Sequence, residues 1–391
     1  MRIAVPREIV PGECRVALDP DAVARLIKLG HSVAVQQGAG ERAGWRDDAY
    51  TAAGAQVTAD LRALYADADA VLKVQPPVRS DALGANEASA MRTGALLIAF
   101  LRPFQNLDGV RLLAERGVTS FAMELVPRIS RAQGMDALSS QATVAGYKAV
   151  ILAADHLPKL FPMLMTAAGT IRPARVLVLG AGVAGLQAIA TAKRLGAVVE
   201  AFDTRPAVAE QVQSLGAKFV GLELTQGDAQ DAGGYARALG EEHLRAEQTL
   251  IADHAADADV VITTAQIPGK PAPRLITLDT LRRMRPGSVV MDLAAESGGN
   301  CEATVAGETI TRDDVTVMGP LHLPSEVPFH ASQMYARNLL ALFQHLAPKG
   351  ALQLDMTDEI TRAACLTTSG EVVNDAVRAR LAQPATKGVF V

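Results

Sequence analysis

The segment RVLVLGAGVAGLQAIATAKRLGA, residues 175–197, constrains the fold of this chain more than any other segment. An apolar run typical of a buried strand leads into GAGVAG, and a stretch with the composition of a helix follows. Gly180 permits the tight turn, Gly182 lets a phosphate approach the backbone, and Gly185 lets helix and strand pack closely. Unpaired N–H groups at the helix N-terminus favour negative charge. The segment therefore predicts a strand–turn–helix unit that binds a dinucleotide.

An acidic residue at the end of the next predicted strand, VVEAFDTR, indicates which dinucleotide binds. Asp203 can accept hydrogen bonds from both hydroxyls of the adenosine ribose and would repel the 2′-phosphate of NADP. Arg205 weakens this inference, because an arginine at that point can bind a 2′-phosphate. We expect NAD(H) to be preferred over NADP(H).

Strand-like and helix-like segments alternate along the whole chain, which predicts parallel sheets built from βαβ units. The expected fold is α/β, with two Rossmann-like domains, doubly wound mostly parallel sheets and an NAD cleft between the domains. The first domain would combine residues 1–140 with 331–391, and residues 141–330 would form the NAD-binding Rossmann domain. Residues 331–346 are expected to form an amphipathic helix, and residues 225–259 a mobile loop followed by a solvated helix.

Composition excludes several classes of protein. The net charge of −4 is spread without blocks, which argues against a nucleic-acid surface or a basic membrane anchor. The three cysteines lie far apart without metal-ligand spacing, as expected for a metal-free chain in a reducing compartment. The apolar run at residues 94–101 is far too short to span a bilayer, and the N-terminus resembles a strand and not a signal peptide. We therefore expect a soluble cytoplasmic chain.

A second motif lies in MELVPRISRAQGMDALSS, residues 123–140, which contains two arginines, an amide and a carboxylate but no cysteine or histidine. On composition alone, such a segment is a solvated loop whose charges pair locally. Asp136 is a poor general base, because Arg128 would hold it ionised. The chemistry served by this loop therefore needs positioned charges and no protein nucleophile.

Six long segments support a family resemblance: PREIVPGECRVALDP, MELVPRISRAQGMDALSSQATVAGYKAV, LVLGAGVAGLQAIATAKRLGA, AGGYARALGEE, TTAQIPGKPAPRLIT and GSVVMDLAAESGGN. Over essentially its full length the chain resembles the NAD(H)-binding alpha subunits of proton-translocating NAD(P) transhydrogenases. The resemblance implies direct hydride transfer between NADH and NADP(H), which is bound only on a partner subunit, coupled to proton translocation by the membrane part. It also implies a homodimer, held at the cytoplasmic side of the inner membrane by an NADP-binding beta subunit and a membrane-spanning subunit.

The resemblance also implies roles for the second motif, which lines the nicotinamide end of the NAD site in that family. Arg128 would hold the nicotinamide side, oriented by Asp136, and Gln133 would reach the second nucleotide across the subunit interface. Ser139 would help to position the dihydronicotinamide, and Tyr235 matches a tyrosine in a mobile loop that closes on the nucleotide. The first four would form the catalytic set, and the full cofactor-binding set would be Arg128, Ile129, Ser130, Arg131, Gln133, Asp136, Ser139, Gly180, Gly182, Val183, Ala184, Gly185, Asp203, Thr204, Arg205, Gly234, Tyr235 and Gln266.

Alanine dehydrogenases are similar to parts of the same chain, so NAD-dependent oxidative deamination of alanine is the alternative function. That chemistry needs a general acid/base, and such relatives place a histidine in the segment where this chain has Arg102. Glu296 stands where they carry aspartate. Lys73 could bind a substrate carboxylate, but we expect a strand-end lysine whose ammonium reaches water. A non-catalytic NAD-sensing module is a third hypothesis, which leaves the second motif without a purpose.

One segment departs from the transhydrogenase pattern. Many members of that family carry Thr with Asn or Asp where Pro320, Leu321 and His322 stand, and Arg where Glu326 stands. The departures concern contacts at the subunit interface or the edge of the nucleotide and leave the expected cofactor unchanged.

Overall fold

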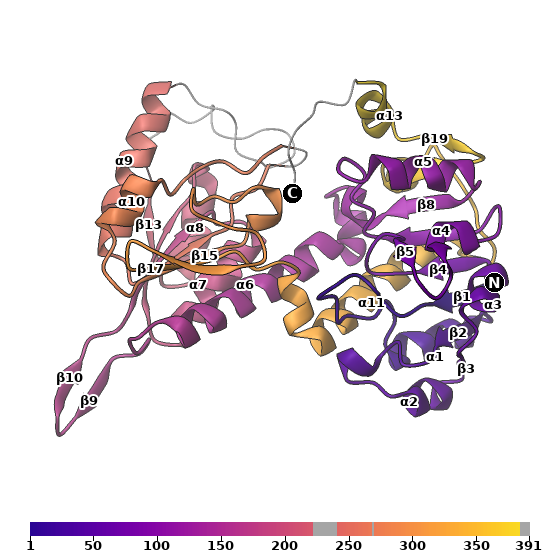
Figure 1. Cartoon of the computed structure of the whole chain (residues 1–391), viewed down its shortest axis with the longest axis horizontal. Helices are drawn as coiled ribbons and strands as arrows, with labels where there is room; N and C mark the ends of the chain where they lie inside the picture. Colours follow the sequence, from indigo (N-terminus) through magenta and orange to yellow (C-terminus); the bar gives the residue numbers. More distant parts are fainter. Residues whose placement is uncertain (222–240, 268–269, 384–391) are drawn as a thin grey trace. The chain divides into compact units, whose positions relative to one another are not determined.

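The computed structural model describes residues 1–221, 241–267 and 270–383. The chain forms two compact units: the first combines Met1–Gln141 with Ser325–Val391, and the second is Ala142–Pro324 (Figure 1). The return to the first unit comes at Ser325 and not at the expected residue 331, because the whole of helix α11 (Pro328–Leu346) belongs to the first unit. Within the described residues, no helix has the length and apolar character needed to cross a membrane.

The first unit is built on an eight-stranded sheet with the order β19-β18-β8-β7-β4-β1-β2-β3. Strands from β8 to β3 pair in parallel, and β18 is antiparallel to both β8 and β19. The central strands are continuous buried apolar runs, as expected for parallel strands covered on both faces. The strands are β1 (Arg2–Val5), β2 (Ser32–Gln36), β3 (Gln56–Thr58), β4 (Ala70–Leu72), β7 (Leu96–Ala99), β8 (Thr119–Ala122), β18 (Cys365–Thr368) and β19 (Glu371–Val372), with a separate hairpin of β5 (Arg79–Ser80) and β6 (Ala85–Asn86).

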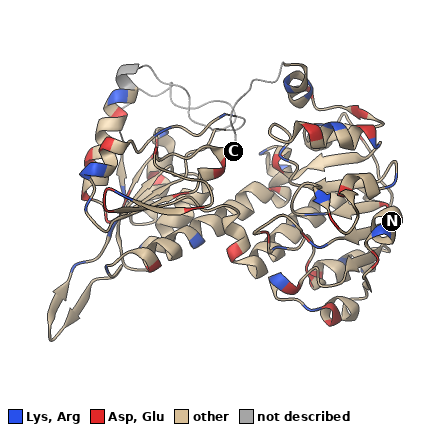
Figure 2. Cartoon of the chain, in the orientation of Figure 1, with Lys and Arg blue, Asp and Glu red and all other residues tan. Residues whose placement is uncertain are grey.

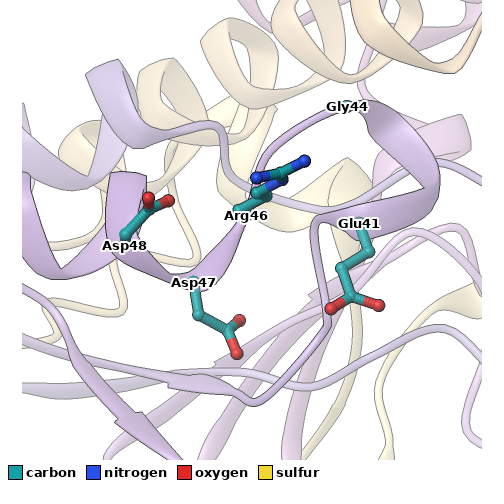
Figure 3. Close-up of a pocket in the computed structure, with 5 residues that line it drawn as sticks. All are labelled: Glu41, Gly44, Arg46, Asp47 and Asp48. Atoms are coloured by element: carbon teal, nitrogen blue, oxygen red, sulfur yellow. The ribbon is translucent and has the colours of Figure 1, made fainter.

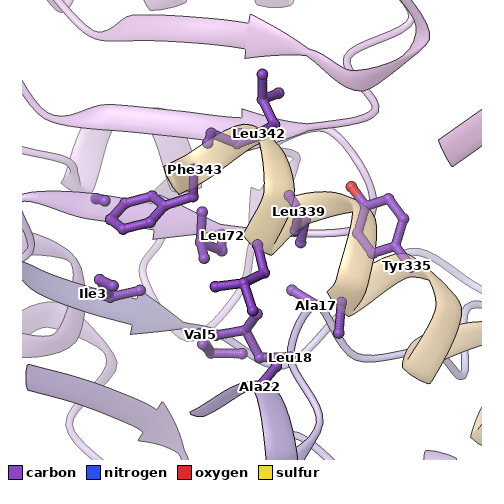
Figure 4. Close-up of a cluster of buried hydrophobic side chains, with 14 of the residues drawn as sticks. Ile3, Val5, Ala17, Leu18, Ala22, Leu72, Tyr335, Leu339, Leu342 and Phe343 are labelled. Atoms are coloured by element: carbon purple, nitrogen blue, oxygen red, sulfur yellow. The ribbon is translucent and has the colours of Figure 1, made fainter. Parts of the chain in front are cut away.

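Helix α11 completes the core of the first unit from far along the sequence. Its side chains Leu339 and Phe343 are fully buried in one cluster with Ile3 of β1 and Leu72 of β4 (Figure 4). Burial of each such side chain stabilises the fold by about 1.5–3 kcal/mol. The other helices of this unit are α1 (Pro20–Lys28), α2 (Asp47–Ala52), α3 (Leu61–Ala66), α4 (Glu87–Ala90), α5 (Leu107–Glu115), α12 (Glu359–Ala364) and α13 (Asp375–Ala382).

The second unit has a seven-stranded sheet with the order β13-β12-β11-β14-β15-β17-β16. Its strands pair in parallel except at the β16–β17 edge, and the order reverses direction between β11 and β14. In doubly wound sheets, ligands bind at the carboxyl ends of the strands at this reversal. The strands are β11 (Arg175–Leu179), β12 (Val198–Phe202), β13 (Lys218–Val220), β14 (Val260–Thr263), β15 (Val289–Asp292), β16 (Thr309–Arg312) and β17 (Val315–Met318).

The helices of the second unit include α6 (Ala137–His156), which begins in the first unit, α7 (Val183–Arg194), α8 (Ala209–Ser214), α9 (Glu241–Asp257) and α10 (Leu278–Arg283). The expectation that α9 is solvated is wrong for one of its faces. Ile251 and Ala255 are buried against strands of the sheet, because they recur at the spacing of one helical turn. The expected mobile loop before α9 lies outside the described residues.

The fold class expected from the sequence is confirmed: both sheets are Rossmann-like, doubly wound and mostly parallel. Charged side chains lie mainly on helices and loops of each unit, and the strands carry few (Figure 2). The buried charged residues are therefore exceptions that need an explanation: Glu8, Glu13, Arg15, Asp19, Lys73, Glu87, Asp203, Glu247, Asp259 and Asp292.

Candidate functional site

The glycine-rich turn, residues 180–185, joins β11 to α7 and is held by contacts that exclude side chains. Gly180 has φ +96, and a Cβ there would lie 2.6 Å from the Thr264 hydroxyl oxygen. A Cβ on Gly185 would lie 1.8 Å from the carbonyl oxygen of Gly180, so only glycine allows α7 to begin so close to β11. Thr264 fixes the turn further by donating a 2.9 Å hydrogen bond to the same carbonyl.

Gly182 differs from its two neighbours in the turn. Its backbone is extended, with φ −76 and ψ −167, and no atom lies within 4 Å of the position that a Cβ would take. The fold itself therefore does not require glycine at this position. A pyrophosphate that approaches the N-terminus of α7 does require it, because a Cβ would occupy the approach.

Helix α6 supports the turn from the other side of the backbone. A Cβ on Gly146 would lie 2.1 Å from the carbonyl oxygen of Ala184, so α6 presses directly against the first turn of α7. Sequence reasoning missed Gly146 and Thr264. The glycine inside a strongly helical pattern was the available indication, since such a glycine usually has a packing reason.

Asp203 follows β12 and lies beside the glycine-rich turn. Its carboxylate accepts a 2.7 Å hydrogen bond from the Ala181 N–H, which ties the two motifs together. It also accepts from Arg205 through the backbone N–H and Nε, both at 2.9 Å, and through Nη2 at 2.8 Å. The residue is 8% exposed. The acid and the arginine that the sequence weighed against each other thus form one ion pair.

Two further residues lie at the same edge of the sheet or beside Asp203. Gln266 follows β14, is exposed, and donates a 3.0 Å hydrogen bond to the Leu293 carbonyl after β15. Glu247 of α9 is buried, and its burial together with the charge of Asp203 raises its pKa to about 7. Sequence reasoning placed Gln266 here but missed Glu247, because nothing in the polar composition of α9 marks one glutamate as buried.

The second motif lies in the first unit as a 3₁₀ helix, Ser130–Met135, that leads into α6. Ala132 and Met135 are buried in the core of the unit, whereas Arg128 and Gln133 are exposed. Asn338 of α11 donates a 2.9 Å hydrogen bond to the Gly134 carbonyl and so holds the backbone. The loop is a supported platform and not the freely solvated segment that its composition indicates.

Polar residues of the same motif shape its two ends. Asp136 caps α6: one carboxylate oxygen accepts from the Ser139 N–H at 2.9 Å and the other from the Ser139 hydroxyl at 2.6 Å. Arg131 pairs with Asp358 at 2.6 Å. Burial alone would raise the pKa of Asp358, but hydrogen bonds from the Thr361 N–H, Arg131 and His345 lower it well below its usual range.

The expectation for Lys73 is wrong. The side chain is 1% exposed and its ammonium lies 3.3 Å from Glu8 and 3.1 Å from Glu87, so it does not reach water. Burial alone would lower the pKa of Lys73, but the two carboxylates outweigh it and raise the pKa. Arg15 is likewise buried and paired with Glu13 at 2.6 Å. Both cations are thus neutralised inside the first unit, which offsets the desolvation of the buried charges.

The remaining predicted residues are placed as follows. Thr204, Ile129 and Val183 lie in the segments described above, as do Ser130 and Ala184. Gly234 and Tyr235 lie outside the described residues. In the segment that departs from the family pattern, His322 has φ +51 and its N–H donates a 3.1 Å hydrogen bond to Glu296. A left-handed backbone at a residue other than glycine is uncommon and marks a specific turn there.

A cavity of about 430 Å³ in the first unit is lined by Glu41, Gly44, Arg46, Asp47 and Asp48 (Figure 3). Asp47 accepts a 2.9 Å hydrogen bond from the Gly38 N–H, so part of this acidic wall shapes its own loop. None of the predicted cofactor-binding residues lines it. Across the described residues, no three His, Cys, Asp or Glu side chains gather as metal ligands.

Comparison with known protein families places this architecture. The family model described as "Alanine dehydrogenase/PNT, N-terminal domain" matches residues 4–145, and "Alanine dehydrogenase/PNT, C-terminal domain" matches residues 149–375. The chain belongs to the alanine dehydrogenase/PNT family.

Within that family the chain is similar above all to transhydrogenase subunits. It is 47% identical over 380 residues to an NAD(P) transhydrogenase subunit alpha chain of Rhodospirillum rubrum, covering 96% of this chain and 99% of the relative. A crystal structure of transhydrogenase from Sinorhizobium meliloti matches with a TM-score of 0.85 and 44% identity over 95% of this chain and 100% of the other. Alanine dehydrogenase of Halomonas elongata is 33% identical over 358 residues, covering 90% of this chain and 88% of that protein.

Proposed function

We propose that this chain is the NAD(H)-binding catalytic subunit of a proton-translocating NAD(P) transhydrogenase. It would transfer hydride directly between NADH and an NADP(H) bound on a partner subunit. The observation that carries the proposal is the 47% identity to a transhydrogenase alpha subunit over 96% of the chain. The lower identity of 33% to an alanine dehydrogenase supports the same choice.

NAD(H) is the proposed cofactor, and the second unit is the proposed NAD-binding domain. The open position at Gly182 and the N-terminus of α7 fit a pyrophosphate. Asp203 stands where a carboxylate accepts hydrogen bonds from the adenosine ribose. NADH should therefore bind more tightly than NADPH, and Asp203→Ala should narrow the difference. Equal binding of NADH and NADPH to the wild-type chain in calorimetry would contradict this assignment.

The loop of the first unit is proposed to position the reacting nicotinamide. A bound nicotinamide supplies the hydride chemistry itself, so the protein needs no acid, base or nucleophile. Its task is to hold the two rings at roughly 3–3.5 Å and to exclude water. Exposed Arg128 and Gln133 on a backbone fixed by Asn338 suit that task, and Asp136 and Ser139 fix the start of α6.

Alanine dehydrogenase activity is the second candidate, and the contacts of two residues argue against it. Lys73 is enclosed by Glu8 and Glu87, so a substrate carboxylate would have to displace an existing ion pair. Arg102, in the segment where a histidine is expected for that chemistry, has φ +49, and its N–H binds the Glu124 carboxylate. Neither residue offers a general acid/base to an amino acid.

The chain is further proposed to form a homodimer. The hairpin of β9 (Leu164–Thr166) and β10 (Gly169–Ile171) projects from the second unit as a thin arm (Figure 1). Its apolar side chains are exposed, including Met165 at 76% and Ile171 at 44%. An apolar arm of this kind indicates a protein contact. Partner subunits carrying NADP(H) and the proton channel would hold the dimer at the cytoplasmic side of the membrane.

One pair of assays tests the function. The purified chain is mixed with NADH, pyruvate and ammonia, and separately with NADH, NADP⁺ and the partner NADP-binding subunit. We expect oxidation of NADH only in the second mixture. Turnover in the first would favour alanine dehydrogenase, and tight NADH binding without turnover in either would favour a sensing module. Chromatography at micromolar concentration should show a dimer, and a strict monomer would contradict the dimer proposal.

A further inference from the structure

The carboxylate of Asp203 is fully occupied by its own chain. A carboxylate offers about four acceptor positions. Oδ1 accepts from the backbone N–H and Nε of Arg205, and Oδ2 accepts from the Ala181 N–H and from Nη2 of Arg205. Four donors thus fill the group that is proposed to bind the adenosine ribose. A nucleotide can bind there only if some of these donors leave.

Only two of the four donors are able to leave. The Ala181 N–H belongs to the glycine-rich turn, which is fixed to β12 by a 2.8 Å hydrogen bond from the Gly180 N–H to the Phe202 carbonyl. The backbone of Arg205 is extended and precedes Pro206, which restricts its rotation. The guanidinium, on a flexible side chain that is 18% exposed, can move without a change in the backbone. The ribose hydroxyls must therefore take the two positions that this guanidinium holds.

We propose that Arg205 sets nucleotide selectivity by competing with the adenosine ribose for Asp203, an inference that rests on the proposed function. When NAD(H) binds, the guanidinium leaves and the 2′- and 3′-hydroxyls donate in its place. A 2′-phosphate has no such proton to donate at neutral pH, and it gains a partner in the displaced guanidinium. Arg205 thus weakens NADH binding and strengthens NADPH binding, so it narrows the selectivity that Asp203 provides.

Glu247 makes the role of this arginine sharper. In α9, His254 binds Glu200 of β12 at 2.6 Å. Glu247 lies two helical turns before His254 on the same face, and Asp203 lies three residues after Glu200 along the strand. These spacings are about 10 Å each, which places Glu247 level with Asp203. A 2′-phosphate would thus meet two acidic side chains, and Arg205 supplies the cation beside them.

Calorimetric titration of the full-length chain with NADH and with NADPH tests the proposal. For Arg205→Ala we expect the NADH dissociation constant to fall about tenfold and the NADPH constant to rise about tenfold. Arg205→Lys keeps the charge but lacks the planar fork, so NADH should tighten while NADPH changes little. Arg312→Ala, which removes an exposed arginine from the opposite edge strand β16, is the matched control and should change neither.

A double-mutant cycle separates competition from a general structural effect. In an Asp203→Asn background, Arg205→Ala should no longer tighten NADH, because the shared carboxylate is gone. Arg205→Ala that binds NADH equally or more weakly than wild type would overturn the competition, and weaker binding would show that Arg205 contacts the nucleotide. If Arg205→Ala fails to fold, the Arg205→Lys titration decides by the same NADH criterion. Wild-type chain that binds neither nucleotide would overturn the proposed function itself.

Discussion

The two regions proposed to contact the dinucleotide are built in opposite ways. The glycine-rich turn of the second unit depends on backbone contacts that leave no space for side chains at Gly185, and it offers N–H groups. The loop of the first unit depends on buried side chains such as Met135 and on Asn338, and it offers the exposed side chains of Arg128 and Gln133. Substitutions should therefore disrupt folding in the turn but only chemistry in the loop.

The largest effect is expected from Gly185→Ala. A Cβ 1.8 Å from the Gly180 carbonyl oxygen would force α7 away from β11. Such a backbone clash should destabilise the second unit by about 3 kcal/mol or more. Urea unfolding followed by circular dichroism measures the loss, and NADH binding should disappear with it.

Gly182→Ala is the matched control for that change, because nothing lies within 4 Å of the added Cβ. We expect the free energy of unfolding to stay within about 0.5 kcal/mol of wild type. NADH affinity should still fall roughly 100-fold, since the methyl group lies where the pyrophosphate approaches. Normal NADH affinity in Gly182→Ala would remove the turn as the phosphate site, whatever Gly185→Ala does.

The next effect concerns rate rather than folding. Arg128→Ala should lower hydride transfer to NADP⁺ by about 10² to 10³, since a preorganised charged contact contributes about 2–4 kcal/mol to the transition state. The NADH dissociation constant should rise by only about threefold to tenfold, because other contacts provide most of the binding. Stopped-flow transfer with saturating partner subunit, together with fluorescence titration of NADH, measures both.

Arg131→Ala provides the control within the same loop. Arg131 is 57% exposed and pairs with Asp358, a surface ion pair that stabilises by at most about 1 kcal/mol. We expect its transfer rate to stay within about threefold of wild type. A loss of rate equal to that of Arg128→Ala would show that the loop responds as a whole and that Arg128 has no special position.

The same contrast explains what the sequence could predict. The turn was predictable from Gly180 and Gly185, because each glycine answers to a local steric demand that recurs in many sheets. Asp203 was predictable for the same reason, but its ion pair with Arg205 was not, because spacing cannot show which partner a side chain selects. Lys73 was misjudged because its partners Glu8 and Glu87 come from distant segments.

The loop of the first unit was harder to judge from its own residues. Its composition indicates a solvated segment, and only the family resemblance marked Arg128 and Gln133 as functional. The support for its backbone comes from Asn338 of α11, which lies far along the sequence and packs there only because the chain returns to the first unit. Local patterns cannot predict a contact of this kind, since it depends on the tertiary fold.

The support of the loop should also depend on pH. Glu124 lies shortly before the loop and accepts a 2.9 Å hydrogen bond from the Leu101 N–H; burial raises its pKa to about 7. A carboxyl group with a raised pKa in the folded state stabilises fully below its unfolded pKa, near 4.5, and this contribution is lost as the pH rises through 7. We expect the free energy of unfolding to fall by about 3 kcal/mol across that window.

Urea unfolding at several pH values between 4.5 and 8 checks this expectation. Glu124→Gln should remove most of the fall, because the neutral amide does not titrate. The exposed Glu115→Gln, at the end of α5, should leave the pH profile unchanged. An unchanged profile in Glu124→Gln would assign the pH dependence to other groups and leave the loop independent of this carboxyl.

The smallest effect on cofactor affinity is expected from Gln133→Ala, and it tests the comparison most finely. Gln133 is exposed on the 3₁₀ helix, so its truncation removes no core contact and should change the free energy of unfolding by less than about 0.5 kcal/mol. Its proposed partner is the nucleotide on the other subunit, so NADH affinity should stay within about twofold of wild type. Hydride transfer to NADP⁺ should nevertheless fall, because the two rings lose one positioning contact. If NADH affinity falls in proportion to rate in both Gln133→Ala and Arg128→Ala, the loop is a binding clamp like the glycine-rich turn, and the contrast between the two regions fails.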